Sequence, residues 1–167
     1  MINIIKKEYE RHIPHAIQIL KNSSQRYYYL ALLMNGNQVV SRGFNQYIGN
    51  NVTQARYCIN SPHGKSDFYI HAERSAIESY MLTRGLRYEK KIEKFKRHNF
   101  TLVVLSITLG GNLRNSKPCD SCVKFLKEMS LKRLVYYEAN CDFIEVNISN
   151  LNSSPSGAYK YKYNLRG

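Results

Sequence analysis

Two short stretches of the chain carry residue types that bind metals and move protons. The stretch YIHAERSAIESY places His71 and Glu73 two positions apart, where a helix is predicted to begin. Two steps along a helix turn the side chain by roughly 200°, so both residues can face one point only at the helix entrance. The apolar residues that follow keep near-helical spacing and predict a buried stripe that begins close to Glu73: Ile77, Met81, Tyr88, Ile92 and Phe95.

The second stretch, PCDSC, contains Cys119 and Cys122 three positions apart at the predicted start of another helix. At this spacing both sulfurs lie on one face of the helix, and the helix amide dipoles favour the thiolate form. These two thiolates and the imidazole of His71 make three ligands, and a catalytic zinc site keeps its fourth position for water. Glu73 is not needed as a ligand and is placed to take a proton from that water.

Together, HAE at residues 71–73 and PCDSC at residues 118–122 form the signature of zinc nucleobase deaminases. On these motifs the chain resembles the cytidine and deoxycytidylate deaminase superfamily, over roughly residues 27–148. The resemblance implies a three-layer fold and one zinc ion, held by His71 and the two cysteines. It also implies that Glu73 shuttles protons between the zinc-bound water and the base.

Three further residues are candidates for contacts with a substrate. By the same resemblance, Asn45, in the sequence GFN, matches a position that commonly binds the substrate sugar. Arg114 and Lys117 come just before the PCDSC helix and could contact a phosphate. A role on a surface loop is an equal alternative for both cations.

The elements that must position these residues alternate between strands and helices. The sequences RYYYLALLM, NGN and QVVSRGF predict a hairpin, because Asn-Gly supplies the positive backbone angles of a tight turn. Further strands are predicted at residues 100–109, 132–138 and 142–148, and a second helix at residues 118–129. This order predicts an α/β protein with a three-layer α/β/α cytidine-deaminase-like fold and a central mixed sheet of about five strands.

We expect one deaminase domain over residues 1–150 and a basic, tyrosine-rich tail over residues 151–167. The domain begins with a helical segment at residues 1–23, in which Pro14 is expected to break or start a helix. Residues from Asn45 to Asp67 are polar and predict a long loop before His71. Loops of such length usually serve a site, so this loop is the candidate lid.

The chain is strongly basic, with a formal net charge of +13, which favours encounters with phosphates of some kind. Much of this charge is local: the stretch from Arg84 to His98 holds seven Lys or Arg against two Glu. This stretch is either the solvated face of a long helix or a patch that contacts phosphates.

The four cysteines, with no signal peptide and no apolar run long enough to span a bilayer, predict a soluble cytoplasmic protein without a disulfide framework. Cys58 and His63 have a spacing compatible with a second metal site, although two more obvious ligands are lacking. Cys141 is expected to be simply buried.

The leading prediction is a zinc-dependent hydrolytic deaminase of nucleotide metabolism that acts on a cytosine nucleoside or nucleotide through zinc-bound hydroxide and releases ammonia. One alternative is a polynucleotide deaminase, which the charge and the tyrosine-rich tail favour. The other is a non-catalytic zinc-stabilised module that binds nucleic acid or a partner, and an intact Glu73 counts against it. We expect a homo-oligomer with weak nucleic-acid binding and no membrane association.

Overall fold

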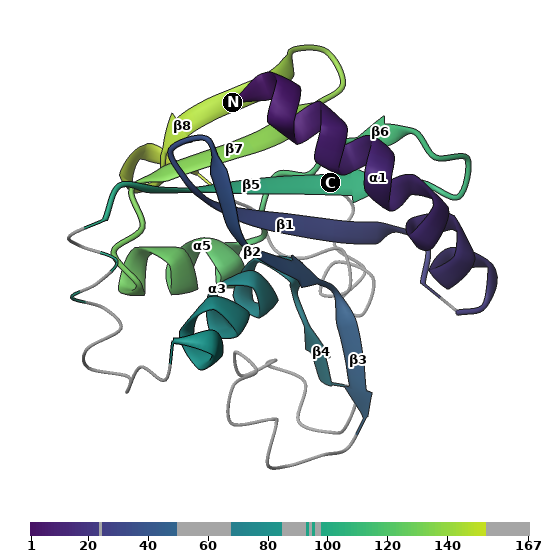
Figure 1. Cartoon of the computed structure of the whole chain (residues 1–167), viewed down its shortest axis with the longest axis horizontal. Coiled ribbons are helices and arrows are strands. Elements are labelled where there is room, and N and C mark those ends of the chain that lie inside the picture. The colour runs from purple at the N-terminus through teal and green to yellow at the C-terminus, as the bar shows by residue number, and fades with distance from the viewer. Residues whose placement is uncertain (24, 50–67, 85–92, 94, 96–97, 153–167) are drawn as a thin grey trace.

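The computed structural model describes residues 1–23, 25–49, 68–84, 93, 95 and 98–152 (Figure 1). Within this part of the chain, no helix is both long and apolar enough to cross a membrane. The elements follow in this order: α1 Ile2–Lys21, β1 Tyr28–Asn35, β2 Gln38–Phe44, β3 Gln46–Gly49, β4 Phe68–Ile70, α3 Ala72–Thr83, β5 Phe100–Ile107, β6 Leu113–Arg114, α5 Asp120–Glu128, β7 Arg133–Glu138, β8 Asp142–Asn147 and the 3₁₀ turn η1 Ile148–Asn150.

The central element is a mixed sheet of six strands in the order β2-β1-β5-β7-β8, with β6 paired to β5. Strands β5 and β7 are parallel, and the other pairs of this sheet are antiparallel. The predicted mixed sheet is therefore confirmed. The strand beyond the five expected is β6, whose two residues are too few to give a sequence pattern.

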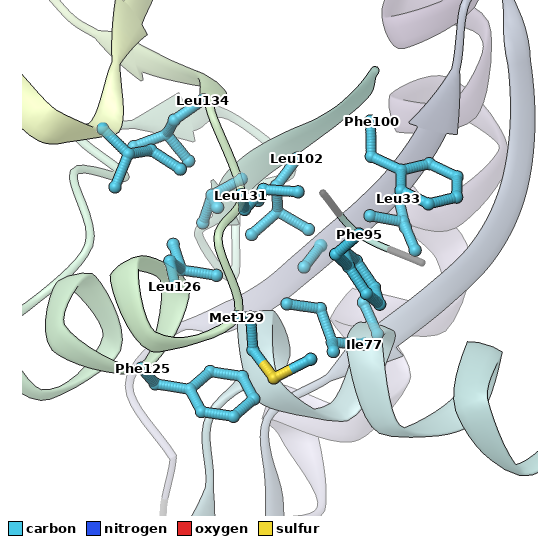
Figure 2. Close-up of a cluster of buried hydrophobic side chains, with 14 of the residues drawn as sticks. Leu33, Ile77, Phe95, Phe100, Leu102, Phe125, Leu126, Met129, Leu131 and Leu134 are labelled. Carbon is cyan, nitrogen blue, oxygen red and sulfur yellow. The ribbon is translucent and has the colours of Figure 1, made fainter. Parts of the chain in front are cut away.

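Alternate residues of the central strands face opposite layers. Leu32 of β1 and Val103 of β5 belong to a core that includes buried residues of α1. Their neighbours Leu33 and Leu102 pack instead with residues of α3 and α5, as Figure 2 shows. Helix α1 lies on one face of the sheet, and α3 and α5 lie on the other (Figure 1). The predicted three-layer fold is confirmed.

The β1–β2 hairpin forms where the sequence predicts it. Gly36, in the turn, has a φ of +57°, a conformation that glycine adopts without steric strain. The register shifts between Leu33 and Met34, which pair with Ser41 and Val39, so the extra residue of the bulge lies in β2. The hairpin supplies one edge of the sheet and carries Asn45 just beyond its second strand.

The expectation that Pro14 breaks or starts a helix is wrong, because α1 continues through it. A proline inside a helix removes one backbone hydrogen bond and costs about 3 kcal/mol. Here the helix is held against the sheet on both sides of Pro14, by Ile5 before it and by Ala16 and Leu20 after it. This packing offsets the cost of the missing hydrogen bond.

Two element boundaries also differ from the sequence prediction. Residues Gln46–Gly49 were expected to begin a loop, but they form β3 and pair with β4. The helix expected to run from His71 through Phe95 ends at Thr83, with Arg84 as its C-cap. Gly85 follows this cap in the sequence and is a common signal for a helix end.

Cys141, expected to be buried, is exposed. It lies in the turn between β7 and β8, where its backbone N–H donates to Glu138 O.

Several predictions for loops concern residues outside those that the structure describes. These are most of the candidate lid, the Cys58 and His63 pair, most of the basic stretch and nearly all of the tail.

An ion pair ties α1 to the edge strand β2. Arg42 donates from Nε and Nη2 to the two carboxylate oxygens of Glu8, each at 2.7 Å. His12 lies beside the same carboxylate, and its Nδ1 donates to the backbone carbonyl oxygen of Glu8, 2.7 Å away. The hydrogen bond from Arg42 holds the pKa of Glu8 below its ordinary value, although partial burial opposes this shift.

Helix α3 approaches β2 so closely that only glycine fits between them. A Cβ added at Gly43 would overlap the backbone of Ala72 and Ala76, with Ala76 Cα only 2.7 Å away. Nearby, Ser41 Oγ donates a hydrogen bond of 2.8 Å to Ala76 O. These contacts set the distance between α3 and the sheet.

Replacing Gly43 by alanine is expected to lower the free energy of unfolding by about 3 kcal/mol, because the backbone of α3 must move away from β2. Thermal and urea denaturation measure this change. Gly110→Ala is the matched control, since its Cβ would make only ordinary contacts, 3.4 Å and longer. Equal stability of the two variants would contradict the close approach.

Glu8→Gln is expected to lower the free energy of unfolding by about 1 kcal/mol at neutral pH, since the pair is partly exposed. Because the folded-state pKa of Glu8 is lowered, its stabilisation is present above the ordinary value of 4.5 and is lost as pH falls through the lowered pKa. The stability difference from the parent protein should therefore shrink at acidic pH. Glu10→Gln is the matched control, since it removes an exposed carboxylate of α1 that does not belong to this ion pair.

Candidate metal centre and surrounding site

Three predicted ligands meet where α3 and α5 begin. His71 is the N-cap of α3, Cys119 is the N-cap of α5, and Cys122 lies in the first turn of α5. His71 Nδ1 is 3.2 Å from Cys122 Sγ and 3.5 Å from Cys119 Sγ. The three ligand atoms lie within 4.8 Å of one another, so the structure brings together residues that are 51 positions apart.

This donor set fits zinc. Bonds of about 2.0 Å to nitrogen and 2.3 Å to sulfur place ligand atoms about 3.5 Å apart across a tetrahedral angle. The observed nitrogen to sulfur distances of 3.2 and 3.5 Å agree with this spacing. Two cysteine sulfurs and one imidazole also suit zinc better than magnesium or calcium, which prefer oxygen ligands. His71, Cys119 and Cys122 are thus positioned to bind a zinc ion.

The two sulfurs differ in their acidity. A hydrogen bond from Cys122 lowers the pKa of Cys119 to about 4, against the effect of burial and with help from His71. The same hydrogen bond, together with burial, raises the pKa of Cys122. Burial acts to lower the pKa of His71, but its hydrogen bond with Cys119 and the nearby negative charges raise it to about 9. Zinc binding needs two thiolates and a neutral imidazole, so uptake of the ion releases protons.

Glu73 lies in the first turn of α3 and is almost completely buried, with 4% of its surface exposed. Burial raises the pKa of its carboxyl group, while the neighbouring His71 opposes this shift. A hydrogen bond with Cys122 acts to lower the pKa of Glu73, so the carboxyl group lies beside the ligands. A carboxyl group in this position can accept a proton from one reacting group and release it to another.

The segment that leads to the cysteine ligands is anchored by a residue that the sequence analysis missed. Ser116 Oγ donates to Val104 O at 2.6 Å and accepts from Tyr137 N–H at 2.8 Å. Its backbone N–H donates to Tyr137 O, and Asn115 Oδ1 accepts from Ala139 N–H. These bonds fix the chain between β5 and β7 just before Pro118. A serine in a polar loop gives no sequence signal for this role.

Asn45 joins the beginning of β1 to the end of β2. Its Oδ1 accepts from Tyr29 N–H at 2.8 Å, and its Nδ2 donates to Gln25 Oε1 at 3.0 Å. Asn45 N–H also donates to Tyr29 O at 3.3 Å. The side chain expected to contact a sugar therefore also holds the backbone beside Tyr27 and Tyr29 in place.

Arg114 and Lys117 occupy different environments. The guanidinium of Arg114 stacks on the ring of Tyr27, with its central carbon 3.5 Å from the ring centre. Its Nη1 atom is buried and has no hydrogen-bond partner in the part of the chain that the structure describes. Lys117 is exposed.

Tyr29 is a second neighbour of the site that the sequence analysis missed. Burial raises the pKa of its hydroxyl; Ser106 and the charge of Arg114 oppose this shift, and the charge of Glu73 adds to it. The charges of Arg114 and Glu73 therefore both act on the hydroxyl of Tyr29. Its position next to the stacked Tyr27 in the run of three tyrosines at residues 27–29 was the available signal.

Comparison with known proteins identifies a matching family and similar solved structures. The profile of the family described as "Cytidine and deoxycytidylate deaminase zinc-binding region" matches residues 6–138. A crystal structure of cytidine deaminase from Burkholderia pseudomallei is similar, with 18% sequence identity over 78% of this chain and 82% of that chain and a TM-score of 0.45. No curated protein sequence matches the chain.

The purified protein is expected to hold about one zinc ion per chain, and Cys119→Ala or Cys122→Ala should lose it, because each removes a ligand. Elemental analysis measures the zinc content, and circular dichroism checks that the variants fold. Cys141→Ala is the matched control, since this exposed cysteine lies outside the metal centre, and it should keep its zinc. A folded Cys119→Ala protein with full zinc content would place the ion elsewhere.

Proposed function

The chain belongs to the cytidine and deoxycytidylate deaminase family, and from this premise we propose that it is a zinc-dependent hydrolytic deaminase of a cytosine nucleoside or nucleotide. One observation carries the proposal: the buried carboxyl group of Glu73 lies beside three side chains that are positioned to bind zinc. A purely structural zinc site has four protein ligands and no use for a buried acid. Three ligands and an adjacent acid suit hydrolysis.

The reaction forms a bond between a water oxygen and C4 of cytosine and breaks the bond from C4 to the amino nitrogen, which leaves as ammonia. Zinc, when bound, supplies the Lewis acidity that activates the water. Glu73 accepts a proton from the attacking water and returns a proton to the departing amino group, so the carboxyl group ends as it began. Its burial keeps bulk water from competing for that proton.

We assign the substrate contacts to the residues on the β1 and β6 side of the metal centre. Asn45 is proposed to contact the sugar, which its position beside Tyr27 and Tyr29 supports. Arg114 and Lys117 are proposed to contact an anionic part of the substrate. Both precede the cysteine ligands in the sequence, and both carry a positive charge.

A polynucleotide substrate is the second candidate, because a formal net charge of +13 favours phosphate-rich partners. Such binding follows net charge and weakens steeply with salt, whereas turnover needs the base seated beside Glu73. We therefore expect binding of single-stranded oligonucleotides to be weak, indifferent to sequence and lost near physiological salt. Deamination of a free cytosine substrate should persist there.

The test is ammonia release by the zinc-loaded protein at physiological salt. The substrates are cytosine, adenine and guanine nucleosides, their nucleotides and single-stranded oligonucleotides. Release from a free cytosine compound supports the proposal. Release from oligonucleotides alone favours the polynucleotide deaminase, and no release from any substrate favours the non-catalytic module.

Glu73→Gln is expected to keep its zinc and its fold but to lower kcat by several orders of magnitude, because the amide cannot carry the proton. Glu128→Gln, an exposed change of the same kind on α5, is the matched control and should retain full activity. Elemental analysis confirms the metal in both proteins. Undiminished ammonia release from the zinc-loaded Glu73→Gln protein would rule out the proton-shuttle role.

A further inference from the structure

One nitrogen atom of Arg114 lacks a hydrogen-bond partner in the described part of the chain. Arg114 stacks on Tyr27, and its Nη1 atom is buried without a hydrogen-bond acceptor among the described residues. A guanidinium stays charged at any physiological pH, so it cannot avoid the cost of an unpaired donor by losing a proton. Leaving such a buried donor unsatisfied is unfavourable, because the donor has lost its hydrogen bonds to water without gaining others. A bound acceptor would remove this cost.

Arg114 belongs to a polar row that crosses three strands. Tyr29 of β1 is directly opposite Ser106 of β5, and Ser106 is directly opposite Arg114 of β6. Directly opposite residues project from the same face of a sheet. This row interrupts an otherwise apolar face, because Leu102 and Val104, at alternate positions of β5, belong to the core.

Ser106 lies between Tyr29 and Arg114 in this row and is completely buried. A hydrogen bond with the Tyr29 hydroxyl opposes the rise in the pKa of that hydroxyl. Arg114 Nη1, in contrast, has no hydrogen-bond partner among the residues that the structure describes. A buried donor of this kind is unusual in a folded protein and indicates a hydrogen bond completed by another molecule.

The row lies on the same side of the sheet as the metal centre. Tyr29 packs against the core formed with α3 and α5, the helices that carry the ligands. The charges of Glu73 and Arg114 both act on its hydroxyl. A ligand that has its base beside Glu73 can therefore extend along the row toward Arg114.

We propose that Arg114, held flat on Tyr27, is the specificity-determining residue that binds the substrate phosphate and makes this enzyme select nucleotides over nucleosides. The inference rests on the proposed function and names the substrate class of the same site. The planar guanidinium matches the geometry of phosphate oxygens, and stacking on an aromatic ring fixes its orientation. A neutral nucleoside offers no anion to the buried Nη1 donor.

Binding of reaction products tests this without depending on turnover. The zinc-loaded protein is titrated calorimetrically with uridine and with uridine 5′-monophosphate. We expect the nucleotide to bind at least about tenfold more tightly, since hydrogen bonds to charged groups are strong. Arg114→Gln should reduce the ratio of nucleotide to nucleoside affinity to near one, because it weakens the binding of the nucleotide alone. Arg26→Gln, which removes an exposed charge next to Tyr27, is the matched control and should keep the ratio.

Two further variants cover the case in which Arg114→Gln does not fold. Arg114→Lys keeps the charge but loses the planar group, and Tyr27→Leu removes the stacking surface but keeps Arg114. Each should lower the ratio of nucleotide to nucleoside affinity severalfold and leave uridine binding unchanged. If these variants lose affinity for uridine and for its monophosphate equally, the role of Arg114 is merely structural. That result would overturn the inference.

The outcomes for the substrate class and for the proposed function are distinguishable. Equal binding of uridine and its monophosphate by the parent protein overturns the inference, even if both cytosine compounds are deaminated. Arg114-dependent nucleotide binding without ammonia release supports the phosphate site and contradicts the proposed activity. If a single-stranded oligonucleotide binds through Arg114 more tightly than the monophosphate does, the site recognises a polynucleotide. That result would overturn the inference that Arg114 selects free nucleotides.

Discussion

The close approach between β2 and α3 is the constraint on which the site depends. Because Gly43 has no side chain, the backbone of α3 at Ala72 and Ala76 lies directly on the strand, and Ser41 fastens it there. This contact fixes the start of α3, which carries His71 and Glu73. A helix displaced by the width of a methyl group would move the imidazole away from the cysteine sulfurs, whose own helix is held separately through Ser116.

Local signals in the sequence were sufficient for the parts of the fold that depend on near neighbours. The Asn-Gly turn predicts the β1–β2 hairpin because glycine is needed at Gly36, and the apolar run at residues 100–107 predicts a central strand because both its faces are buried. The three metal ligands were also predictable. Two cysteines three positions apart at one helix start, together with a histidine at another, are typical of a zinc site.

Long-range contacts explain what the sequence did not predict. Strand β3 forms by pairing with β4, which begins after 18 further, mostly polar residues, so no local sequence pattern predicts β3. Pro14 stays inside α1 because the sheet supports both halves of the helix. The stacking of Arg114 on Tyr27 joins residues 87 positions apart by their numbering, and only the folded sheet reveals that they are neighbours.

The parallel pairing of β5 and β7 has a consequence for the order of assembly. Antiparallel neighbours can join through a short turn, but this pair needs a crossover connection, and that crossover contains α5 with both cysteine ligands. His71 comes from a separate segment before β5. The complete ligand set therefore exists only after the crossover has closed against α3, and metal capture favours the finished topology over partly folded chains by mass action.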